Sequence, residues 1–336
     1  MRAVAYRKSL PISAADALVD VELDRPRAAG RDLLVAVKAV SVNPVDYKVR
    51  LRADPKGEPK VLGFDAAGIV VEAGAEATLF KPGDEVFYAG SITRSGTNAE
   101  FHLVDERITG HKPRRLGFAE AAALPLTSIT AWELLFDRLG VTCGAGRDTR
   151  AALIVGGAGG VGSIAIQLAR RLTGLTVIAT ASRPETVSWC RELGVHHVID
   201  HRQPFAPQLA AAGIAAVDLV LGLTATDQHL AQIAEVIAPQ GRFGLIDDPK
   251  ALDISVFKRK SVSVHWESMF TRSIYQTPDM IEQHDLLDEV SRLVDEGVLR
   301  TTLGENLGRI NAANLKRAHA LVESGTSRGK LVLEGF

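Results

Sequence analysis

The hydrophobic and polar positions divide the chain into three stretches with different periodicities. Up to about residue 105, short apolar runs alternate with polar positions and are separated by Gly, Pro and charged turns. This pattern is typical of a compact antiparallel β-barrel or sandwich. We expect strands in the segments RAVAYR, LVDVEL, LLVAVKAV, AAGIVVEAG, DEVFYAG and AEFHLV.

From Phe118 the periodicity is helical, and it predicts one helix that stops at Gly140. Strands and helices then alternate, and the six apolar strands are mostly joined by helices. This pattern predicts a parallel, doubly wound α/β sheet, with a loop at residues 247–260. The strands are expected in AALIVG, TVIATAS, HHVID, AVDLVLGL, GRFGLID and SVSVHWES.

The last stretch contains two helical segments, MIEQHDLLDEVSRLVDEG and NAANLKRAHALVESG, and a final strand, KLVLEGF. It is long enough to return to the first module. We therefore predict one domain from residues 1–126 and 272–336, and a dinucleotide-binding domain from residues 127–271. The active site is expected in the cleft between them.

Composition narrows the possible partners. The 336 residues include 39 Lys and Arg against 40 Asp and Glu, so no global field attracts nucleic acid or anionic lipid. Small molecules are the expected ligands. Only Cys143 and Cys190 occur, which excludes a disulfide framework and a four-cysteine zinc cluster and suits a reducing, cytoplasmic setting. The first residues do not resemble a secretory signal.

One uncharged segment, residues 151–169, is long enough to imitate a membrane span. Its five glycines make a continuous helix unfavourable, so we expect a strand, a turn and a helix instead. The turn, Gly157-Ala158-Gly159-Gly160-Val161-Gly162, satisfies G-x-G-x-x-G. In this context the motif predicts a pyrophosphate site at a helix start. The alternative is a glycine-rich turn needed only for packing.

The end of the second strand bears on the choice of dinucleotide. An NAD enzyme usually carries Asp or Glu there, whereas this chain has Ser182 and Arg183. Both side chains can donate to a 2′-phosphate, which favours NADPH over NADH. The alternative is that Arg183 is a solvated loop residue.

Three other patterns could suggest a functional site, but we assign no function to them. Residues 325–329 match the hydrolase pattern G-x-S-x-G, but a nucleophile elbow needs a strand before it and a helix after it, and here the order is reversed. His196, His197 and His201 lie on or beside a short strand without a Cys or Glu at ligand spacing, so we expect surface or rim histidines. Asp247-Asp248 is interpreted as a solvated turn.

Six stretches carry a wider likeness: SVNPVDYK, LGFDAAGIVVEAG, FKPGDEVF, AAALPLTSITAWELLFDRL, VGGAGGVGSIAIQLAR and GKLVLEGF. In this order they resemble the medium-chain dehydrogenase/reductase superfamily, over nearly the whole length. The resemblance implies an N-terminal GroES-like β-barrel-type domain and a Rossmann domain with a doubly wound parallel sheet.

Two branches of this superfamily have to be separated. The resemblance places Asn43 where zinc members have a catalytic cysteine, Phe64-Asp65 where they have His-Glu, and FYAGSITRSGTNAEF where they have a four-cysteine lobe. Asp65 alone cannot build a catalytic zinc site, which needs three protein ligands. The chain therefore resembles the zinc-free quinone oxidoreductases and their enone-reducing relatives, and within them the proteins labelled zinc-type alcohol dehydrogenase-like.

For this branch the resemblance implies bound NADPH and no metal. The matching cofactor positions are Asn43 near the nicotinamide, Thr130 near a phosphate or ribose, the glycine-loop residues at the pyrophosphate, and Ser182 with Arg183 at the 2′-phosphate. The glycine-loop set is Gly157, Gly159, Gly160, Val161 and Gly162, and further positions are Leu223, Ile246, Phe270 and Lys330.

Without a metal, hydrogen-bond donors must meet the charge that develops on the acceptor oxygen. Tyr47, Lys48 and Asn43 are the candidate catalytic residues, and Asp46 would orient their loop. The resemblance places the proton-relay hydroxyl of zinc members at Val45, so that relay is broken. For Tyr47 the alternative is a packed aromatic, and Asp46 and Asp65 could equally accept backbone N–H groups.

We therefore expect a cytoplasmic, homodimeric, NADPH-dependent reductase of quinones or α,β-unsaturated carbonyl compounds. Two alternatives remain open. One is a zinc-dependent alcohol dehydrogenase, and the other is an NADPH-binding protein with a structural, sensory or RNA-binding role.

Overall fold

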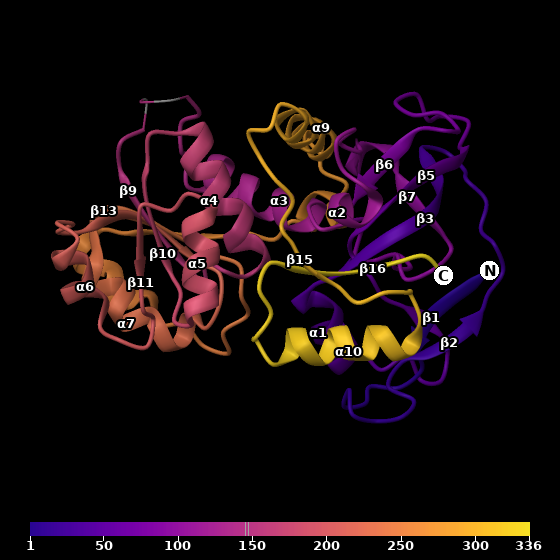
Figure 1. Cartoon of the computed structure of the whole chain (residues 1–336), viewed down its shortest axis with the longest axis horizontal. Helices are drawn as coiled ribbons and strands as arrows, with labels where there is room; N and C mark the ends of the chain where they lie inside the picture. Colours follow the sequence, from indigo (N-terminus) through magenta and orange to yellow (C-terminus); the bar gives the residue numbers. More distant parts are fainter. Residues whose placement is uncertain (145, 147) are drawn as a thin grey trace. The chain divides into compact units, whose positions relative to one another are not determined.

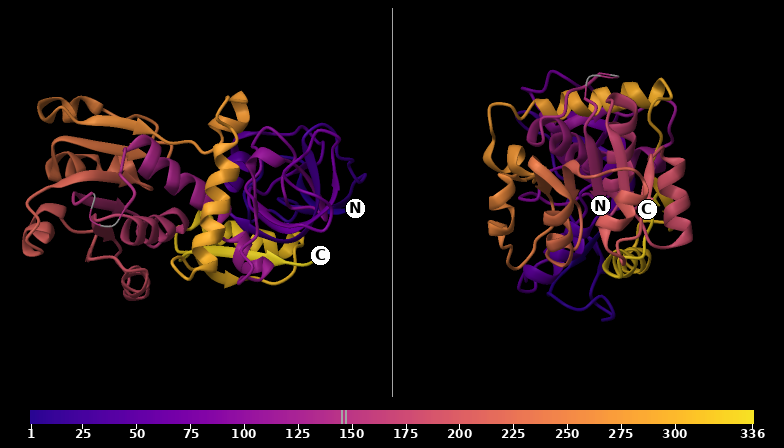
Figure 2. Two further views of the ribbon diagram at one scale, coloured as in Figure 1. Left: turned by 90° about the horizontal axis from the view of Figure 1, so that it is seen from above. Right: turned by 90° about the vertical axis from the view of Figure 1, so that its left-hand side faces the viewer.

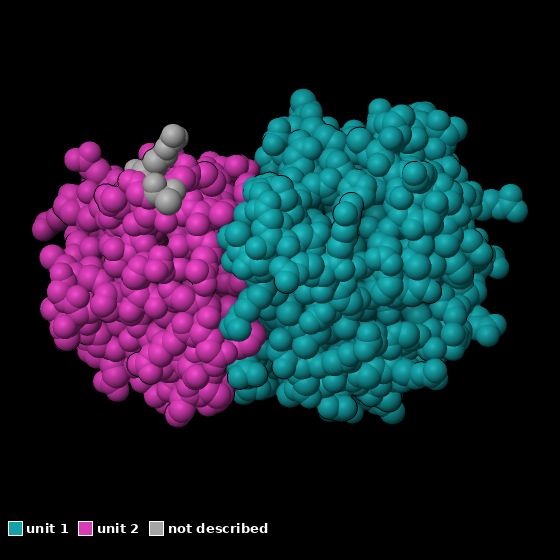
Figure 3. Space-filling model, turned by 45° about the horizontal axis from the view of Figure 1, so that its top comes forward, with its two compact units in different colours: residues 1–129, 270–336 teal, residues 130–269 magenta. Residues whose placement is uncertain are grey.

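A computed structural model of the chain describes residues 1–144, 146 and 148–336. The chain forms two compact units, shown in different colours in Figure 3. Unit 1 consists of residues 1–129 and 270–336, and unit 2 of residues 130–269. The C-terminal stretch thus belongs to the same unit as the N-terminal stretch.

Unit 1 is built on a seven-stranded sheet that is mainly antiparallel. The path β15-β16-β3-β5-β6-β8 is extended by β7, which pairs with β3. A three-stranded sheet, β2-β1-β4, accompanies it. The strands are β1 (Arg2–Tyr6), β2 (Val19–Glu22), β3 (Asp32–Val42), β4 (Lys60–Val61), β5 (Ala66–Ala73), β6 (Glu85–Tyr88), β7 (Phe101–Asp105), β8 (Thr109–His111), β15 (Leu303–Asn306) and β16 (Lys330–Glu334).

Strand β3 is the centre of this sheet. It pairs with β7 over its first half and with β16 over its last residues, both antiparallel. The register places Leu331 opposite Val42. As a result, the C-terminal strand brings Lys330 to the end of β3, 287 residues away from Asn43 in sequence.

Six α-helices of unit 1 accompany the sheet. Helix α2 packs on β3, β5 and β16, helix α9 packs on β8, and α1 packs on α10 (Figure 1). Their bounds are α1 (Pro44–Arg52), α2 (Phe118–Ala122), α3 (Pro125–Trp132, which continues into unit 2), α8 (Thr271–Tyr275), α9 (Glu282–Asp295) and α10 (Ala312–Glu323).

The sequence did not predict helix α1, which begins inside SVNPVDYK. Pro44 occupies the first helical position, where its missing N–H costs nothing. At the third position Asp46 Oδ2 accepts a hydrogen bond of 2.7 Å from the backbone N–H of Asn43. These residues start the helix by capping.

The single helix predicted from Phe118 to Gly140 is wrong in one respect. Helix α2 ends at Ala122 and α3 starts at Pro125, because proline lacks the N–H that would continue the ladder. After Trp132 the chain continues as a π-helical segment, Glu133–Arg138. Gly140 follows with φ of 58°, as expected for a helix-terminating glycine.

Unit 2 contains a six-stranded, fully parallel sheet in the order β11-β10-β9-β12-β13-β14. This is the Rossmann order, and the predicted α/β fold class is confirmed. The strands are β9 (Ala151–Val155), β10 (Thr176–Thr180), β11 (His197–Ile199), β12 (Val217–Gly222), β13 (Ile237–Leu245) and β14 (Ser263–Trp266).

The helices of unit 2 cover both faces of its sheet (Figure 2). They are α4 (Gly160–Leu172), α5 (Pro184–Glu192), α6 (Phe205–Ala211) and α7 (Thr226–Val236). The segment predicted as a loop contains a 3₁₀ helix, Ile254–Lys260, in which Lys260 Nζ donates to carbonyl groups at the end of α7. Among the described residues no helix is long and apolar enough to cross a membrane. The segment 151–169 folds as β9, a turn and α4, as predicted.

Candidate functional site

Four buried polar residues of unit 1 form what we call the buried cluster: Asn43, Asp46, Asp65 and Lys330. Each is at most 3% exposed. Lys330 Nζ lies 3.1 Å from Asp65 Oδ2, donates to the Val42 carbonyl oxygen at 3.1 Å, and donates to Asn43 Oδ1. Asn43 Nδ2 in turn donates to Asp65 Oδ2 at 2.7 Å. The cluster is a closed network of donors and acceptors.

Asp65 is the principal acceptor of the cluster. Besides Lys330 and Asn43, Ser41 Oγ donates to its Oδ2 at 2.8 Å and the Leu126 backbone N–H donates to its Oδ1 at 2.7 Å. Burial raises the pKa of Asp65, whereas Lys330 and these donors oppose the rise. Burial also lowers the pKa of Lys330, against the attraction of Asp65. Because four donors face the carboxylate, we assign the charged ion pair.

Asp46 holds the backbone in place. Its oxygens accept hydrogen bonds from the N–H groups of Asn43 and Gly63, at 2.7 and 2.9 Å. Burial raises its pKa to about 7, although these bonds and Lys330 lower it. The backbone-binding interpretation of Asp46 and Asp65 therefore matches their observed contacts.

Tyr47 and Lys48 follow Asp46 in the first turns of α1, and both are half-buried. Neither belongs to the buried cluster, whereas Asn43 does. The three candidate catalytic residues thus lie at the start of the same helix, but Asn43 is buried in the cluster whereas the other two are half-buried outside it. Their catalytic roles remain predictions.

The loop SITRSG, which the resemblance places where zinc members have a four-cysteine lobe, is held to the sheet by side-chain contacts. Arg94 makes a bidentate ion pair with Asp32, at 2.7 and 2.8 Å. His102 Nε2 donates to the Ser95 carbonyl oxygen at 2.9 Å, and burial lowers the pKa of His102 to about 4. A neutral buried histidine and a surface ion pair therefore hold this loop.

In unit 2 the glycine loop connects β9 to α4, as predicted. A Cβ on Gly162 would lie 2.3 Å from the Gly156 carbonyl oxygen, and one on Gly157 would lie 2.6 Å from Ala179 Cβ. On Gly159 the nearest atom would be 3.5 Å away. Gly157 and Gly162 are thus required by packing within the chain. The space beside Gly159 is what a pyrophosphate approaching the backbone needs.

Two side chains that the sequence did not single out fasten this loop. Thr180 Oγ1 accepts a hydrogen bond of 2.9 Å from the Gly156 N–H, and Ser163 Oγ donates to the Gly159 carbonyl oxygen at 2.7 Å. Trp189 Nε1 on α5 donates to Ser163 Oγ at 2.8 Å. The serine in the first turn of α4 was the available clue, since short hydroxyl side chains commonly bond nearby backbone carbonyls.

The predicted 2′-phosphate residues lie at the carboxyl end of β10. Arg183 Nε is 2.8 Å from Glu185 Oε1, and both side chains are partly exposed. The structure adds a second arginine, Arg202, which donates to the Ser182 carbonyl oxygen at 2.8 Å and pairs with Asp200. It follows β11, the parallel neighbour of β10. This adjacency of strand ends could have been inferred from the predicted sheet.

The remaining predicted cofactor residues lie on separate elements. Leu223 and Ile246 are half-buried at the carboxyl ends of β12 and β13, and Thr130 is buried in α3. Phe270 belongs to unit 1, where its ring packs edge-on against Phe64 with a centroid distance of 5.5 Å. Their contacts with a cofactor remain predictions.

Asp247, interpreted as part of a solvated turn, instead caps α7. Its two oxygens accept from the backbone N–H and the hydroxyl of Thr226, at 2.8 and 2.6 Å. That interpretation was wrong for Asp247, because the start of α7 needs acceptors for its free N–H groups.

A buried pair of glutamates was also missed. Glu133 begins the π-helical segment and Glu267 follows β14, and both are at most 4% exposed. Arg138 Nε donates to Glu267 at 2.8 Å. Burial and then the neighbouring Glu133 raise the pKa of Glu267 well above its usual value, against the attraction of Arg138.

The three histidines near β11 do not form a metal site. Over the part of the chain that the structure describes, no three His, Cys, Asp or Glu side chains are placed to hold a metal ion. His196 Nδ1 accepts a hydrogen bond of 2.9 Å from the Val177 N–H.

The comparisons with known proteins agree with this architecture. Residues 29–132 match the alcohol dehydrogenase GroES-like domain family, and residues 193–333 match the zinc-binding dehydrogenase family. The zinc-type alcohol dehydrogenase-like protein SAS2087 of Staphylococcus aureus (strain MSSA476) is 38% identical over 335 residues, 99% of each chain. The chain belongs to the medium-chain dehydrogenase/reductase superfamily. As a superfamily member it is an oxidoreductase.

Three more relatives of this superfamily member are informative. A Rhizobium etli CFN 42 protein assigned to the zinc-dependent alcohol dehydrogenases has a crystal structure with a TM-score of 0.97 and 65% identity, covering 100% of this chain and 98% of that one. The quinone oxidoreductase of Coxiella burnetii has a TM-score of 0.80 and 27% identity, covering 100% and 99%. The 2-methylene-furan-3-one reductase of Solanum lycopersicum is 38% identical over 180 residues, 50% of this chain and 44% of that protein.

Because several of these names refer to zinc, we tested whether the buried cluster fits the metal. Catalytic zinc takes three ligands from Cys, His and carboxylate side chains. In the cluster, Asp65 and Asp46 accept hydrogen bonds on both oxygens, Asn43 offers only an amide, and Lys330 places an ammonium among them. This donor set does not fit catalytic zinc.

Proposed function

We propose that this superfamily member is an NADPH-dependent oxidoreductase that uses no zinc and reduces quinones or α,β-unsaturated carbonyl compounds. The observation that carries the proposal is the Lys330 ammonium, which is paired with Asp65 inside the buried cluster. The lysine supplies a fixed positive charge at the place where the resemblance puts the ligands of a metal.

Several residues of unit 2 would hold the cofactor. The space beside Gly159 and the N–H groups at the start of α4 suit a pyrophosphate. Ser182 and Arg183, with the added Arg202, suit a 2′-phosphate. Bound NADPH would supply the hydride. The contacts of Asn43, Thr130, Leu223, Ile246, Phe270 and Lys330 belong to the same proposal.

The class of acceptor follows from the charge that the protein has to stabilise. When no metal polarises the carbonyl group, an acceptor whose anion is already delocalised is favoured over a simple aldehyde or ketone. The names of the Coxiella quinone oxidoreductase and the tomato reductase fit this class. Tyr47 or Lys48 would donate to the acceptor oxygen from the first turns of α1.

The decisive experiment is an NADPH oxidation screen with quinones, enones and simple aldehydes, run with and without a chelator. We expect turnover of quinones or enones that the chelator does not change, and weaker turnover of aldehydes. Metal analysis of the purified protein should find no stoichiometric zinc. One zinc per chain and chelator-sensitive alcohol oxidation would instead support a zinc-dependent alcohol dehydrogenase, the function that the relatives' names suggest. Tight NADPH binding without any turnover would support a non-catalytic role.

A second measurement addresses the proton donor. Tyr47→Phe should lower kcat for the best acceptor if the hydroxyl donates, whereas Lys48→Met tests the neighbouring ammonium. Unchanged turnover of every acceptor by Tyr47→Phe would exclude donation from that hydroxyl.

A further inference from the structure

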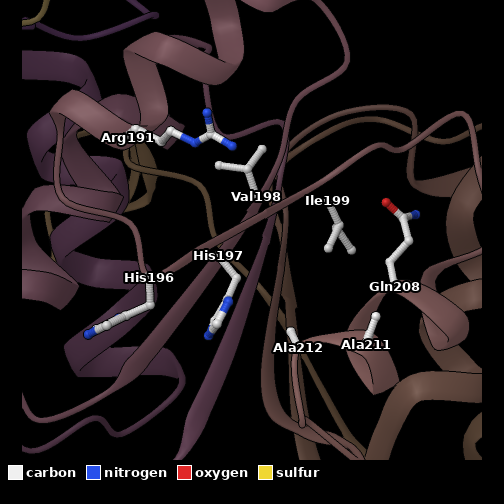
Figure 4. A pocket seen from close by; sticks show the side chains of 8 residues that line it. All are labelled: Arg191, His196, His197, Val198, Ile199, Gln208, Ala211 and Ala212. Atoms are coloured by element: carbon white, nitrogen blue, oxygen red, sulfur yellow. The ribbon is translucent and has the colours of Figure 1, made fainter.

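A cavity of about 360 Å³ lies along the edge strand β11 of unit 2 (Figure 4). Its polar lining comes from Arg191 near the end of α5, His196 and His197 at the start of β11, and Gln208 on α6. The rest of the lining is apolar: Val198, Ile199, Ala211 and Ala212. The described residues that line the cavity include three basic side chains and no carboxylate.

The cavity is distinct from the predicted cofactor site. In a parallel doubly wound sheet the dinucleotide binds at the carboxyl ends of the strands, where the glycine loop follows β9. The cavity instead lies along the whole length of β11 and the preceding His196, and beside the last turns of α5 and α6, and no residue of the glycine loop lines it. None of the residues predicted to contact NADPH lines it.

The basic side chains of the cavity are available to a ligand. Within the described part of the chain, neither Arg191 nor His197 has a carboxylate partner. His196 accepts on Nδ1 from the Val177 N–H, so Nε2 carries the ring proton and can donate. Burial and then the charge of Arg170 hold the pKa of His196 below its usual value, which favours the neutral ring. The positive charge at the cavity therefore comes from the Arg191 guanidinium.

We propose that this cavity is a second ligand site, which binds a small organic carboxylate. A guanidinium can engage both oxygens of a carboxylate, and the imidazole groups add further donors. The side chains of Val198, Ala211 and Ala212 would cover the hydrocarbon part of the ligand. The volume of the cavity lies within the range of small-molecule sites.

The test is calorimetric titration of the full chain, saturated with NADPH, with octanoate as the probe. Octylamine and 1-octanol are the matched probes that keep the chain length and change the head group. We expect octanoate to bind and the other two not to bind measurably. Arg191→Gln and His197→Gln should each weaken octanoate binding by about tenfold, the loss expected for one charge-assisted hydrogen bond.

Arg259→Gln is the control variant, since Arg259 is an exposed arginine of the same unit outside the cavity. It should leave the affinity unchanged. The proposal is overturned if octanoate does not bind, if it binds only when NADPH is left out, if 1-octanol binds equally well, or if all three variants behave alike. Circular dichroism of each variant confirms that a lost affinity does not come from unfolding.

Discussion

Lys330 uses all three protons of its ammonium within the protein. The acceptors are the Val42 carbonyl oxygen, Asn43 Oδ1 and Asp65 Oδ2. A contact between Lys330 and a cofactor would therefore require one of these bonds to break. Its more direct effect is on Asn43, whose amide is fixed with the oxygen toward Lys330 and the nitrogen toward Asp65.

Replacing Lys330 by Met should destabilise unit 1 strongly, because Asp65 would remain buried without its counter-charge. Breaking a buried ion pair in this way costs about 3–5 kcal/mol. The double variant Lys330→Met, Asp65→Asn should lose less than the single variant. Urea unfolding measures both, and Lys81→Met on the exposed surface of unit 1 is the control. A loss as small as that of the control would contradict the ion-pair assignment.

Arg183 provides a prediction about cofactor choice. Arg183→Ala should weaken NADPH binding by roughly 1.5–3 kcal/mol and leave NADH binding almost unchanged, because only NADPH carries the 2′-phosphate. Glu185→Gln should have the opposite effect on NADPH, since Glu185 competes for the same guanidinium. Fluorescence titrations with both cofactors measure the difference. Equal losses for NADPH and NADH would rule out the proposed pairing.

At the scale of elements, the glycine loop offers two matched substitutions. Gly159→Ala should leave the melting temperature nearly unchanged, because φ is −71° and the nearest atom to a new Cβ is 3.5 Å away. It should nevertheless weaken NADPH binding, since the methyl group would fill the space offered to the pyrophosphate. Gly162→Ala should lower the melting temperature, because the new Cβ would clash with backbone at 2.3 Å. Normal NADPH binding by Gly159→Ala would contradict the proposed role of the loop in cofactor binding.

Most long elements could be predicted from the sequence, whereas helix α1 could not. The central strands of unit 2, β9, β10 and β12, are buried apolar runs, and their pattern is unambiguous. Helix α1 lacks such a pattern because its buried side chains are Asp46 and Arg50, which are held by hydrogen bonds. Helix propensity and hydrophobic periodicity do not reveal stabilisation by hydrogen bonds to buried polar side chains. The glutamate pair, Glu133 and Glu267, could not be predicted from the sequence either, because its members are far apart in the chain.

Across the whole molecule, acid should destabilise unit 1 through buried histidines. His319 on α10 is fully buried, its ring nitrogens have no hydrogen-bond partner among the described residues, and burial next to Arg50 lowers its pKa to about 3. The unfolded chain takes up this proton near pH 6.5, so stability falls as the pH drops from about 6.5 and levels off below about 3.

Over that window one histidine contributes about 1.4 kcal/mol per pH unit. His319→Leu should therefore reduce the difference in unfolding free energy between pH 6.5 and pH 4.5 by about 2 kcal/mol or slightly more. His102, whose pKa is lowered to about 4, accounts for part of the remaining slope. Urea unfolding at the two pH values checks this, and an unchanged slope in the variant would contradict it.

Like the fold, the candidate site has parts that could be predicted from the sequence and parts that could not. Its local parts, the glycine loop and the strand end at Ser182 and Arg183, are recognisable because each lies within a few residues of sequence. In the buried cluster, the pairing of β3 with β5 brings Asn43 close to Asp65, and the pairing of β16 with β3 adds Lys330. Chemistry that depends on such long-range pairing cannot be located by motif alone.

The pairing of β16 with β3 also has a consequence for biosynthesis. Unit 2 is one uninterrupted segment, so all of its strands are available before residues 270–336 have been translated. The sheet of unit 1 cannot be completed at that stage, because β16 (Lys330–Glu334), which pairs with the central strand β3, has not yet been translated. A ribosome that stops before codon 330 would release a chain that contains all of unit 2 and an Asp65 carboxylate without the counter-charge of Lys330. The buried cluster is therefore completed only after Lys330 has been translated.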